Sequence, residues 1–478
     1  MTAGLRAWRA AILHFDARRE PRRIDDGLLV VQDGTIVDLG NFGELHESWA
    51  GVDLSDWRGL TLAPGFVDIH VHFPQFDVIG SPADGLLPWL EHYTFPAEAA
   101  FADPAHAAAV APLFLDELLR HGVTTAMVYG SSHPASVDAL FAEARARRLR
   151  MIAGKTLMDQ NCPDGVRDRT EQSLLDTEAL IRRWHGVDRL GYALTPRFVP
   201  SCSEAQMRGC AALADRHPGV WTQTHVAENR DEIAWVARLY PSARSYLDVY
   251  ERMGLLRPRG VFGHCIWLDD DDRARLRAHD ASAAICPTSN LFLGSGLYDF
   301  AAAGRAGLRQ GLASDVGGGS SFSPFRTMMA AYEVARLRGV ALSPSTLWRL
   351  HTLDAARAID LEGRIGNLAV GADADFIALD PGARSLLARR AAAARSLDEW
   401  LFAMIVLADD RAIRHVVVDG ECRRVPAQDP GRGSRLARIW AKEAGTSTRN
   451  RPQGLLTVER GTESRLAARL ASRKNSSG

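Results

Sequence analysis

The stretch from Pro64 to His72, with the sequence PGFVDIHVH, constrains the fold of this chain more than any other. Its four large apolar residues are typical of a buried strand, and the Pro-Gly pair marks where that strand starts. Because side chains alternate along a strand, His70 and His72 point to the same side. Two imidazoles in this arrangement at a strand end are half of a metal site. A lone His-x-His pair also occurs by chance in half-buried strands, so the rest of the chain has to decide between the two interpretations.

Composition excludes several classes of protein. The 478 residues are enough for one large domain and a smaller one. The formal net charge of -1 gives no reason to expect nucleic acid or an acidic membrane surface as a partner. The six cysteines form no C-x-x-C pair, which argues against a structural zinc knuckle, and their scatter is typical of reduced cytosolic thiols. The chain shows no signal peptide and no run of about 18 apolar residues, so we expect a cytoplasmic protein that does not cross a membrane.

Strand-like and helix-like segments alternate between residues 61 and 362. The helical period is clear in stretches such as Ala105–Leu119 and Glu232–Leu239. Eight strands are predicted, at Leu62–His72, Val123–Tyr129, Met151–Met158, Leu190–Phe198, Val220–Val226, Gly260–Ile266, Ala281–Cys286 and Leu308–Ser314. Eight such units in about 300 residues have the size of a (β/α)8 TIM-type barrel, in which the chemistry sits at the carboxyl ends of the strands.

Both ends of the chain are predicted to build a small β-sandwich domain. Residues 1–60 contain short strands and an Asp33-Gly34 hairpin turn. Residues 363–425 contain the strands Phe376–Leu379 and Ile413–Val418, the second of them closed by Asp419-Gly420. Residues 426–478 are rich in Arg, Ser, Gly and Thr, and we expect a disordered tail with a short helix at most over Ser464–Arg473.

Polar residues stand at the ends of five predicted strands, and these ends share one mouth in a barrel. Strand 1 ends with His70 and His72, strand 4 with Arg197 and Phe198, strand 5 with His225 and Glu228, strand 6 with His264, and strand 8 with Asp315. Imidazole and carboxylate ligands suit Zn²⁺ and also Fe²⁺, and a position left open for water would make such a site catalytic.

Each of these residues also has a structural interpretation. His225 alone could be a core histidine, and His264 could be barrel packing. Glu228 could be a favourable acid in the first turn of a helix, and Asp315 could cap the glycine-rich loop 316–319. Their joint occurrence at successive strand ends favours a catalytic metal site.

This pattern resembles the amidohydrolase superfamily over residues 50 to 425, and the longer motifs resemble its guanine deaminase family. These motifs are FPQ at 73–75, WLEHYTFPAE at 89–98, TPRF at 195–198, HVAENRDE at 225–232, CPTSNL at 286–291 and SDVGGG at 314–319. The chain has Ser314 where the family leads us to expect Thr, a change that should not disturb Asp315. The resemblance implies a cytoplasmic homodimer that acts in guanine catabolism.

The resemblance also implies a role for each site residue. The metal ligands would be His70, His72, His225 and Asp315, which hold one divalent ion per chain, Zn²⁺ in preference to Fe²⁺. The catalytic residues would be Glu228, His264 and Asp315, with Glu228 carrying a proton from water to the ring and then to the leaving ammonia. The substrate-binding residues would be Gln75, Arg197, Phe198, His225 and Glu228. Arg197 suits a carbonyl such as guanine O6, Gln75 suits a purine edge, and Phe198 offers an apolar wall.

Other functions remain open at this stage. A related mononuclear deaminase of the superfamily could act on another aminated purine, pterin or triazine ring. A barrel without activity could serve as a scaffold. Such a protein could lose its metal ligands freely, whereas this chain keeps every one of them. The other zinc-deaminase signature, H-x-E with P-C-x-x-C, is absent from this chain. A second metal is not expected, because strand 4 ends in Arg197 where binuclear relatives carry a lysine. Lys155 belongs to strand 3 and could line the site or form a structural ion pair.

Overall fold

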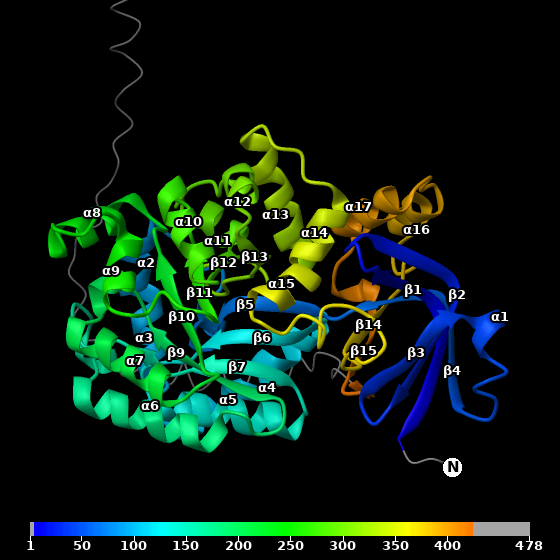
Figure 1. Cartoon of the computed structure of the whole chain (residues 1–478), viewed down its shortest axis with the longest axis horizontal. Helices are drawn as coiled ribbons and strands as arrows, with labels where there is room; N and C mark the ends of the chain where they lie inside the picture. Colours follow the sequence, from blue (N-terminus) through cyan, green and yellow to red (C-terminus); the bar gives the residue numbers. More distant parts are fainter. Residues whose placement is uncertain (1–3, 424–478) are drawn as a thin grey trace, which may run out of the picture. The chain divides into compact units, whose positions relative to one another are not determined.

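The computed structural model describes residues 4–423, shown in Figure 1. The predicted tail at 426–478, with its possible helix, lies outside the described residues. The strands are β1 Leu5–Phe15, β2 Pro21–Gln32, β3 Thr35–Asn41, β4 Asp53–Pro64, β5 Phe66–His72, β6 Val123–Tyr129, β7 Arg150–Gly154, β8 Thr156–Leu157, β9 Leu190–Pro196, β10 Trp221–Val226, β11 Gly260–His264, β12 Ser282–Ile285, β13 Arg309–Leu312, β14 Phe376–Leu379, β15 Ile413–Val418 and β16 Glu421–Arg423.

Helices lie between most of the strands. The α-helices are α1 Phe42–Leu45, α2 Leu86–Trp89, α3 Phe95–Ala100, α4 Pro104–Arg120, α5 Pro134–Ala146, α6 Thr170–Trp184, α7 Glu204–Arg216, α8 Arg230–Leu239, α9 Tyr246–Arg252, α10 Asp270–Ala278, α11 Pro287–Phe292, α12 Phe300–Ala306, α13 Pro324–Leu337, α14 Pro344–Leu350, α15 Leu353–Ala358, α16 Ser385–Ala392 and α17 Leu397–Leu407. Shorter turns are η1 Phe73–Val78, η2 Leu90–Thr94, η3 Asp164–Val166, η4 Val199–Ser201 and η5 Asp410–Ala412.

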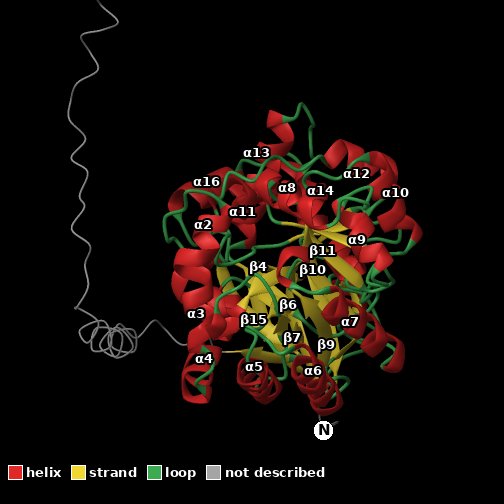
Figure 2. Cartoon of the chain, turned by 90° about the vertical axis from the view of Figure 1, so that its left-hand side faces the viewer, coloured by secondary structure: helices red, strands yellow, loops and turns green. Residues whose placement is uncertain are grey.

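Eight parallel strands form the predicted barrel. Their order is β5-β6-β7-β9-β10-β11-β12-β13, with β8 paired to β9. Figure 2 shows the strands in yellow surrounded by helices in red. Between β13 and β5 the barrel is closed by the residues that follow β13, because the Ser314 N–H donates to Asp68 Oδ1 (3.0 Å) and the Asp315 N–H donates to the His70 carbonyl (2.9 Å). These two hydrogen bonds also hold the end of β5, which carries His70 and His72, beside Asp315.

The strand predictions were accurate where residues such as glycine mark both ends of the apolar run. Val123–Tyr129 is β6 as predicted, and the other barrel strands differ by a few residues at their ends. The first predicted strand was wrong at its start, because residues 62–64 end β4 and pair with β14 instead. Gly65 separates β4 from β5, and a Cβ added there would lie 2.2 Å from Thr124 Oγ1, so the chain passes at a point where only glycine fits. The third predicted strand is interrupted at Lys155, between β7 and β8.

The strands from both ends of the chain form one continuous seven-stranded sheet. Its order is β16-β15-β14-β4-β1-β2-β3, so N-terminal and C-terminal segments meet at β4 and β14. Figure 1 shows these segments together, the N-terminal strands in blue beside the C-terminal ones in yellow and orange. The Asp33-Gly34 turn joins β2 and β3, with φ values of 48° and 79° that suit a tight hairpin. The domain limits at residues 60 and 363 remain predictions.

Apolar side chains fill the interior of the barrel, so its polar residues lie at one end. One buried cluster combines Val67, Ile152 and Trp221 from the early residues of their strands with Ala355 of α15 and Ile359 beyond it. The Trp221 indole N–H also donates to the Ile359 carbonyl (2.8 Å). The barrel is therefore a packed core, and its polar residues gather at the carboxyl ends of the strands.

Among the helices of residues 4–423, none is both long and apolar enough to span a bilayer.

Candidate active site

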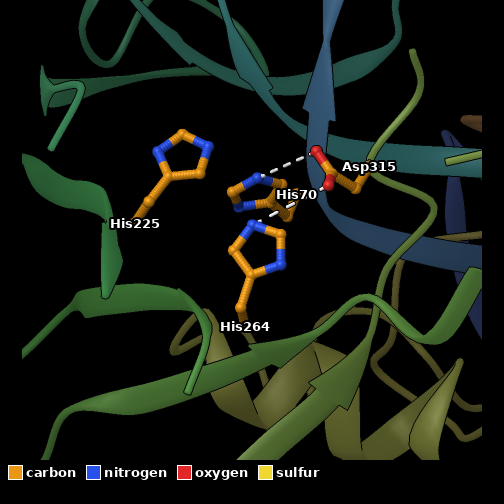
Figure 3. Close-up of side chains that lie close together, drawn as sticks. All are labelled: His70, His225, His264 and Asp315. Atoms are coloured by element: carbon orange, nitrogen blue, oxygen red, sulfur yellow. Dashed lines mark ion pairs between the residues drawn. The ribbon is translucent and has the colours of Figure 1, made fainter. Parts of the chain in front are cut away.

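Four ligand-type side chains meet at the carboxyl end of the barrel. His70 and His72 end β5, His225 lies near the end of β10, and Asp315 follows β13. His72 Nε2 lies 3.2 Å from His70 Nε2 and 3.2 Å from His225 Nε2. Asp315 Oδ1 lies 3.2 Å from the Nε2 atoms of both His70 and His72. Figure 3 shows His70, His225 and Asp315 converging, together with His264.

These separations fit a metal ion. A tetrahedral zinc ion with bonds of about 2.0–2.1 Å holds its ligand atoms about 3.3 Å apart, and the four separations given above lie close to that spacing. His264 Nε2 lies 3.8 Å from Asp315 Oδ2, and His70, His225, His264 and Asp315 also form a group whose ligand atoms lie within 4.8 Å of one another. His72 Nε2 lies 3.2 Å from the ligand atoms of His70, His225 and Asp315, whereas the nearest carboxylate oxygen to His264 Nε2 belongs to Glu228, at 3.3 Å.

The imidazoles are suited to bind a cation because they are neutral. Burial lowers the pKa of His70, lowers that of His72 to about 4, and lowers that of His225 well below the usual range. His225 Nδ1 lies 2.6 Å from the Arg197 carbonyl, which can only accept. His225 therefore carries its proton on Nδ1 and keeps a lone pair on Nε2, facing the other ligands.

The backbone bends sharply where these residues leave their strands. Ala227, His264 and Asp315 have φ values of 50°, 68° and 51°, a left-handed conformation that costs about 1–3 kcal/mol for residues other than glycine. The bend at Ala227, directly after β10, redirects the chain so that Glu228 faces the same centre as His225. Gly263 allows a close approach on the other side, since a Cβ there would lie 2.6 Å from His70 Cε1.

Glu228 is a buried carboxyl beside the metal-type ligands without belonging to them. Its Oε2 lies 3.3 Å from His264 Nε2, and its Oε1 accepts a hydrogen bond from Ser295 Oγ (3.0 Å). Burial, followed by the negative charge of Asp315, raises the pKa of Glu228 to about 8. A carboxyl group with a pKa near neutrality can act both as a base and as an acid.

The His264 ring is oriented by a hydrogen bond to Asn290. Its Nδ1 lies 2.9 Å from Asn290 Oδ1, which can only accept, so the Nδ1 atom carries the proton. The Nε2 atom is then turned toward Glu228 and Asp315. Asn290 belongs to the CPTSNL motif, and this contact gives the motif a physical role.

Arg197 and Gln75 face the same pocket and share a buried partner. Arg197 Nη1 donates to both carboxylate oxygens of Glu98, at 2.7 and 2.8 Å. Gln75 Nε2 donates to Glu98 Oε1 (3.1 Å), and Gln75 Oε1 accepts from the Gly317 N–H (3.2 Å). Glu98 is completely buried.

One pocket connects these groups. Its walls are formed by His72, Gln75, Leu86, Trp89, Leu90, Arg197, Phe198, His225, Glu228, Glu232, His264, Leu293, Asp315 and Gly318. All the residues that the sequence predicts for substrate binding line this pocket. His70 lies beneath it, fully buried.

Sequence reasoning missed two residues that line the pocket, Trp89 and Glu232, and two that contact residues of its lining, Glu98 and Ser295. Glu98, Trp89 and Glu232 lie in motifs that the sequence singles out, but nothing in a strand-end argument assigns them to the site. Ser295 lies 67 residues from Glu228 in the sequence, and no local pattern marks it. Lys155 does not line the pocket; its Nζ pairs with Asp168 Oδ1 (2.6 Å) in the barrel wall, so the structural alternative holds.

The site and the fold agree with the comparisons. The model of the Amidohydrolase family matches residues 61–423. The chain is 42% identical to a guanine deaminase of Escherichia coli (strain K12) over 400 residues, which cover 84% of this chain and 91% of that relative. A solved structure of E. coli guanine deaminase superposes with a TM-score of 0.86 at 39% identity, over 88% of this chain and 99% of that chain. A guanine deaminase from C. acetobutylicum, solved with guanine bound in its active site, superposes with a TM-score of 0.82 at 28% identity over 88% of this chain and 100% of that chain. The chain therefore belongs to the amidohydrolase family and, within it, to the hydrolases that include the guanine deaminases.

Proposed function

We propose that this protein converts guanine and water to xanthine and ammonia. The observation that carries the proposal is the pocket, which is lined by His72, His225, Asp315 and Glu228 together with Arg197 and Gln75. The likeness to guanine deaminases over most of the chain supports the same conclusion.

His70, His72, His225 and Asp315 would hold one divalent metal ion, with Zn²⁺ as the proposed ion. When bound, such an ion lowers the pKa of a water molecule so that it becomes a nucleophile near neutral pH. The neutral imidazoles and the ionised Asp315 supply the ligand chemistry. Burial works against the charge on Asp315, but the neighbouring His70, His72 and His264 hold its pKa well below the usual range.

Glu228 moves the protons of the reaction. The water oxygen adds to C2 of guanine, and Glu228 takes the proton of the water and delivers it to the ring nitrogen beside C2. Glu228 then takes the second water proton from the hydroxyl group at C2 and gives it to the exocyclic amine as the C2–N bond breaks, so that the C2 carbonyl forms, ammonia leaves and xanthine remains. The raised pKa of Glu228, about 8, suits a group that accepts and donates in turn. His264 lies 3.3 Å from its Oε2 and orients it.

Arg197, Gln75 and Phe198 hold the purine. Guanine presents two acceptors on one edge, O6 and N7. The Arg197 guanidinium offers only donors, which suits the O6 carbonyl. Phe198 is buried in the pocket wall and supplies apolar surface to the ring.

A second candidate function is deamination of another aminated purine, pterin or triazine ring, because the proton chemistry at Glu228 does not depend on the ring. A screen that follows ammonia release from purine bases, nucleosides, pterins and triazines separates the two. The proposal expects guanine to give the highest kcat/KM of the panel. A higher kcat/KM for any other ring would replace guanine as the substrate, and no ammonia from guanine would refute the proposal.

The family membership also supports three further proposals about the whole protein. We propose that two chains form a homodimer, that the enzyme works in the cytoplasm, and that it serves guanine catabolism. Light scattering of the purified protein tests the first, and a mass of about one chain would contradict it. Cell fractionation and growth on guanine as a nitrogen source, with and without the gene, test the other two.

A further inference from the structure

Glu98 is a buried acid next to the pocket to which the proposed chemistry gives no task. It lies on α3, 99 residues away from Arg197 in the sequence, and its side chain is completely buried. Burying a carboxylate is costly unless it is paired, and Glu98 is paired twice, with the Arg197 guanidinium and the Gln75 amide. Both partners are residues that the proposed function assigns to the substrate.

Glu98 determines which way the Gln75 amide faces. A carboxylate oxygen only accepts, so the Gln75 atom 3.1 Å from Glu98 Oε1 has to be the NH₂ group. The carbonyl oxygen of Gln75 is then turned to the Gly317 N–H, 3.2 Å away. The acceptor of this amide is therefore occupied by the backbone, and one N–H of its NH₂ group remains for a ligand.

Glu98 also fixes Arg197 and balances its charge. One guanidinium nitrogen, Nη1, donates to both oxygens of the carboxylate. The guanidinium also lies near the Phe95 ring, whose centroid is 5.4 Å from Cζ. The remaining guanidinium N–H groups are donors as well. The edge of the pocket formed by Arg197 and Gln75 thus offers N–H donors, and its one amide oxygen is already bound by the Gly317 N–H.

We propose that Glu98 is a positioning residue that fixes this donor-only edge, and that it thereby makes the site select purines with an oxo group at C6 over purines with an amino group there. The inference rests on the proposed function. An oxo group accepts from the edge, whereas a 6-amino group would place donor against donor. A site built around a hydrogen bond discriminates strongly against ligands that cannot make it.

Three bases that share the 2-amino group and differ only at C6 test this inference. They are guanine (6-oxo), 2-aminopurine (6-hydrogen) and 2,6-diaminopurine (6-amino), each followed by ammonia release from C2. The variants are Glu98→Gln, which keeps the size and lets the side chain donate, and Glu91→Gln as control. Glu91 is exposed in the neighbouring segment η2.

The expected result is a change in preference. In Glu98→Gln, kcat/KM for guanine falls about 10- to 100-fold, the size expected for a charged hydrogen bond, while kcat/KM for 2-aminopurine changes less than about threefold. The guanine to 2,6-diaminopurine ratio falls accordingly, and Glu91→Gln keeps the ratios of the wild type. Metal content stays at the wild-type level, since Glu98 touches no proposed ligand.

An equal fall of kcat/KM on all three bases in Glu98→Gln would show a merely structural role and overturn the inference. If Glu98→Gln does not fold, Glu98→Asp takes its place in the test. Its side chain is shorter by one methylene group, so the negative charge stays near Arg197 but lies farther from it. Its guanine to 2-aminopurine ratio is expected to fall at least threefold, and an unchanged ratio in the folded variant overturns the inference. If the wild type deaminates guanine but the variants keep the wild-type ratios, the inference about Glu98 is wrong and the proposed function still holds. If the wild type is inactive on all three bases, the inference and the proposed function are both wrong.

Discussion

At Glu228 the surroundings oppose the charged form of a carboxyl group. Burial and the charge of Asp315 raise its pKa to about 8, and the Ser295 hydroxyl only partly offsets this by donating to Oε1. Near neutral pH the group exists in both protonation states, which a proton carrier requires. Its side chain contacts His264 and Ser295, and it is not one of the residues proposed to hold the metal.

Replacing Glu228 by Gln should remove proton transfer and little else. The amide keeps the shape of the side chain and can still accept from Ser295, but it cannot carry a proton. We expect kcat to fall by at least about 10²–10⁴-fold, with metal content unchanged and guanine binding within a few-fold. Steady-state kinetics, elemental analysis and equilibrium binding check the three parts. Asp231→Asn, an exposed acid three residues on, is the control, and a Glu228→Gln enzyme with more than about a tenth of wild-type kcat would refute the role.

The turn from β10 into α8 is the element that carries the chemistry. Glu232 Oε2 accepts the backbone N–H groups of Glu228 (3.0 Å) and Asn229 (3.1 Å), and its Oε1 accepts from Tyr246 Oη (2.7 Å). This is the acidic half of a capping box, and Asn229 caps the same helix. The fully buried Glu232 therefore holds the backbone of Glu228 directly after the left-handed residue Ala227.

Glu232→Ala should weaken both the fold and the reaction, because it leaves three buried donors without an acceptor. We expect a loss of about 1–3 kcal/mol of unfolding free energy and a fall in kcat of about tenfold or more, with KM for guanine nearly unchanged. Chemical denaturation and steady-state kinetics measure these. The neighbouring Asp231→Ala, which removes an exposed acid, should stay within about 0.5 kcal/mol of the wild type. Wild-type kcat in Glu232→Ala would mean that the turn does not position Glu228.

Local patterns predicted most of the elements, and most of the residues that the structure brings together in the candidate site. The strand β6 was predicted to the residue because its apolar run is bounded by Gly122 and Gly130. The ligand-type residues were found because each stands at a strand end and the barrel order places those ends together. Glu98 could not be found in this way, because its partner Arg197 is 99 residues distant. The start of the first barrel strand failed for the same reason, since only pairing with the distant β14 assigns residues 62–64 to the other sheet.

At the scale of the whole molecule, buried charges join the base of the barrel to the sheet. Arg150 pairs with Asp373, and Arg189 with Asp375, so that β7 and the segment before β9 are tied to the chain that enters β14. His351, between α14 and α15, is an uncharged link to Val67 of the barrel strand β5. Its Nδ1 lies 3.1 Å from the Val67 carbonyl, and its own carbonyl accepts from the Val67 N–H (3.0 Å).

His351 should make the protein lose stability in acid. Burial lowers its pKa to about 4 in the folded state, against about 6.5 in the unfolded chain. Between these values only the unfolded chain binds the proton, so the free energy of unfolding falls as pH drops from 6.5 to 4, by about 3 kcal/mol in total for this group.

The variant His351→Asn keeps a donor near Nδ1 but cannot titrate, so its unfolding free energy should depend less steeply on pH in this window. Denaturation of both proteins at several pH values gives the difference in slope, and His92→Asn, at an exposed position, should keep the wild-type slope. Parallel pH curves for His351→Asn and the wild type would show that His351 does not contribute.

The central claim is that His70, His72, His225 and Asp315 hold one metal ion at which guanine is deaminated. A titration of the chelator-treated protein with Zn²⁺, following xanthine formation from guanine, tests it most directly. The account predicts almost no activity without metal, a linear rise, and a plateau at about one ion per chain, with no recovery in His70→Ala. Activity that survives chelation, a plateau at about two ions per chain, or no xanthine at any metal concentration would contradict it.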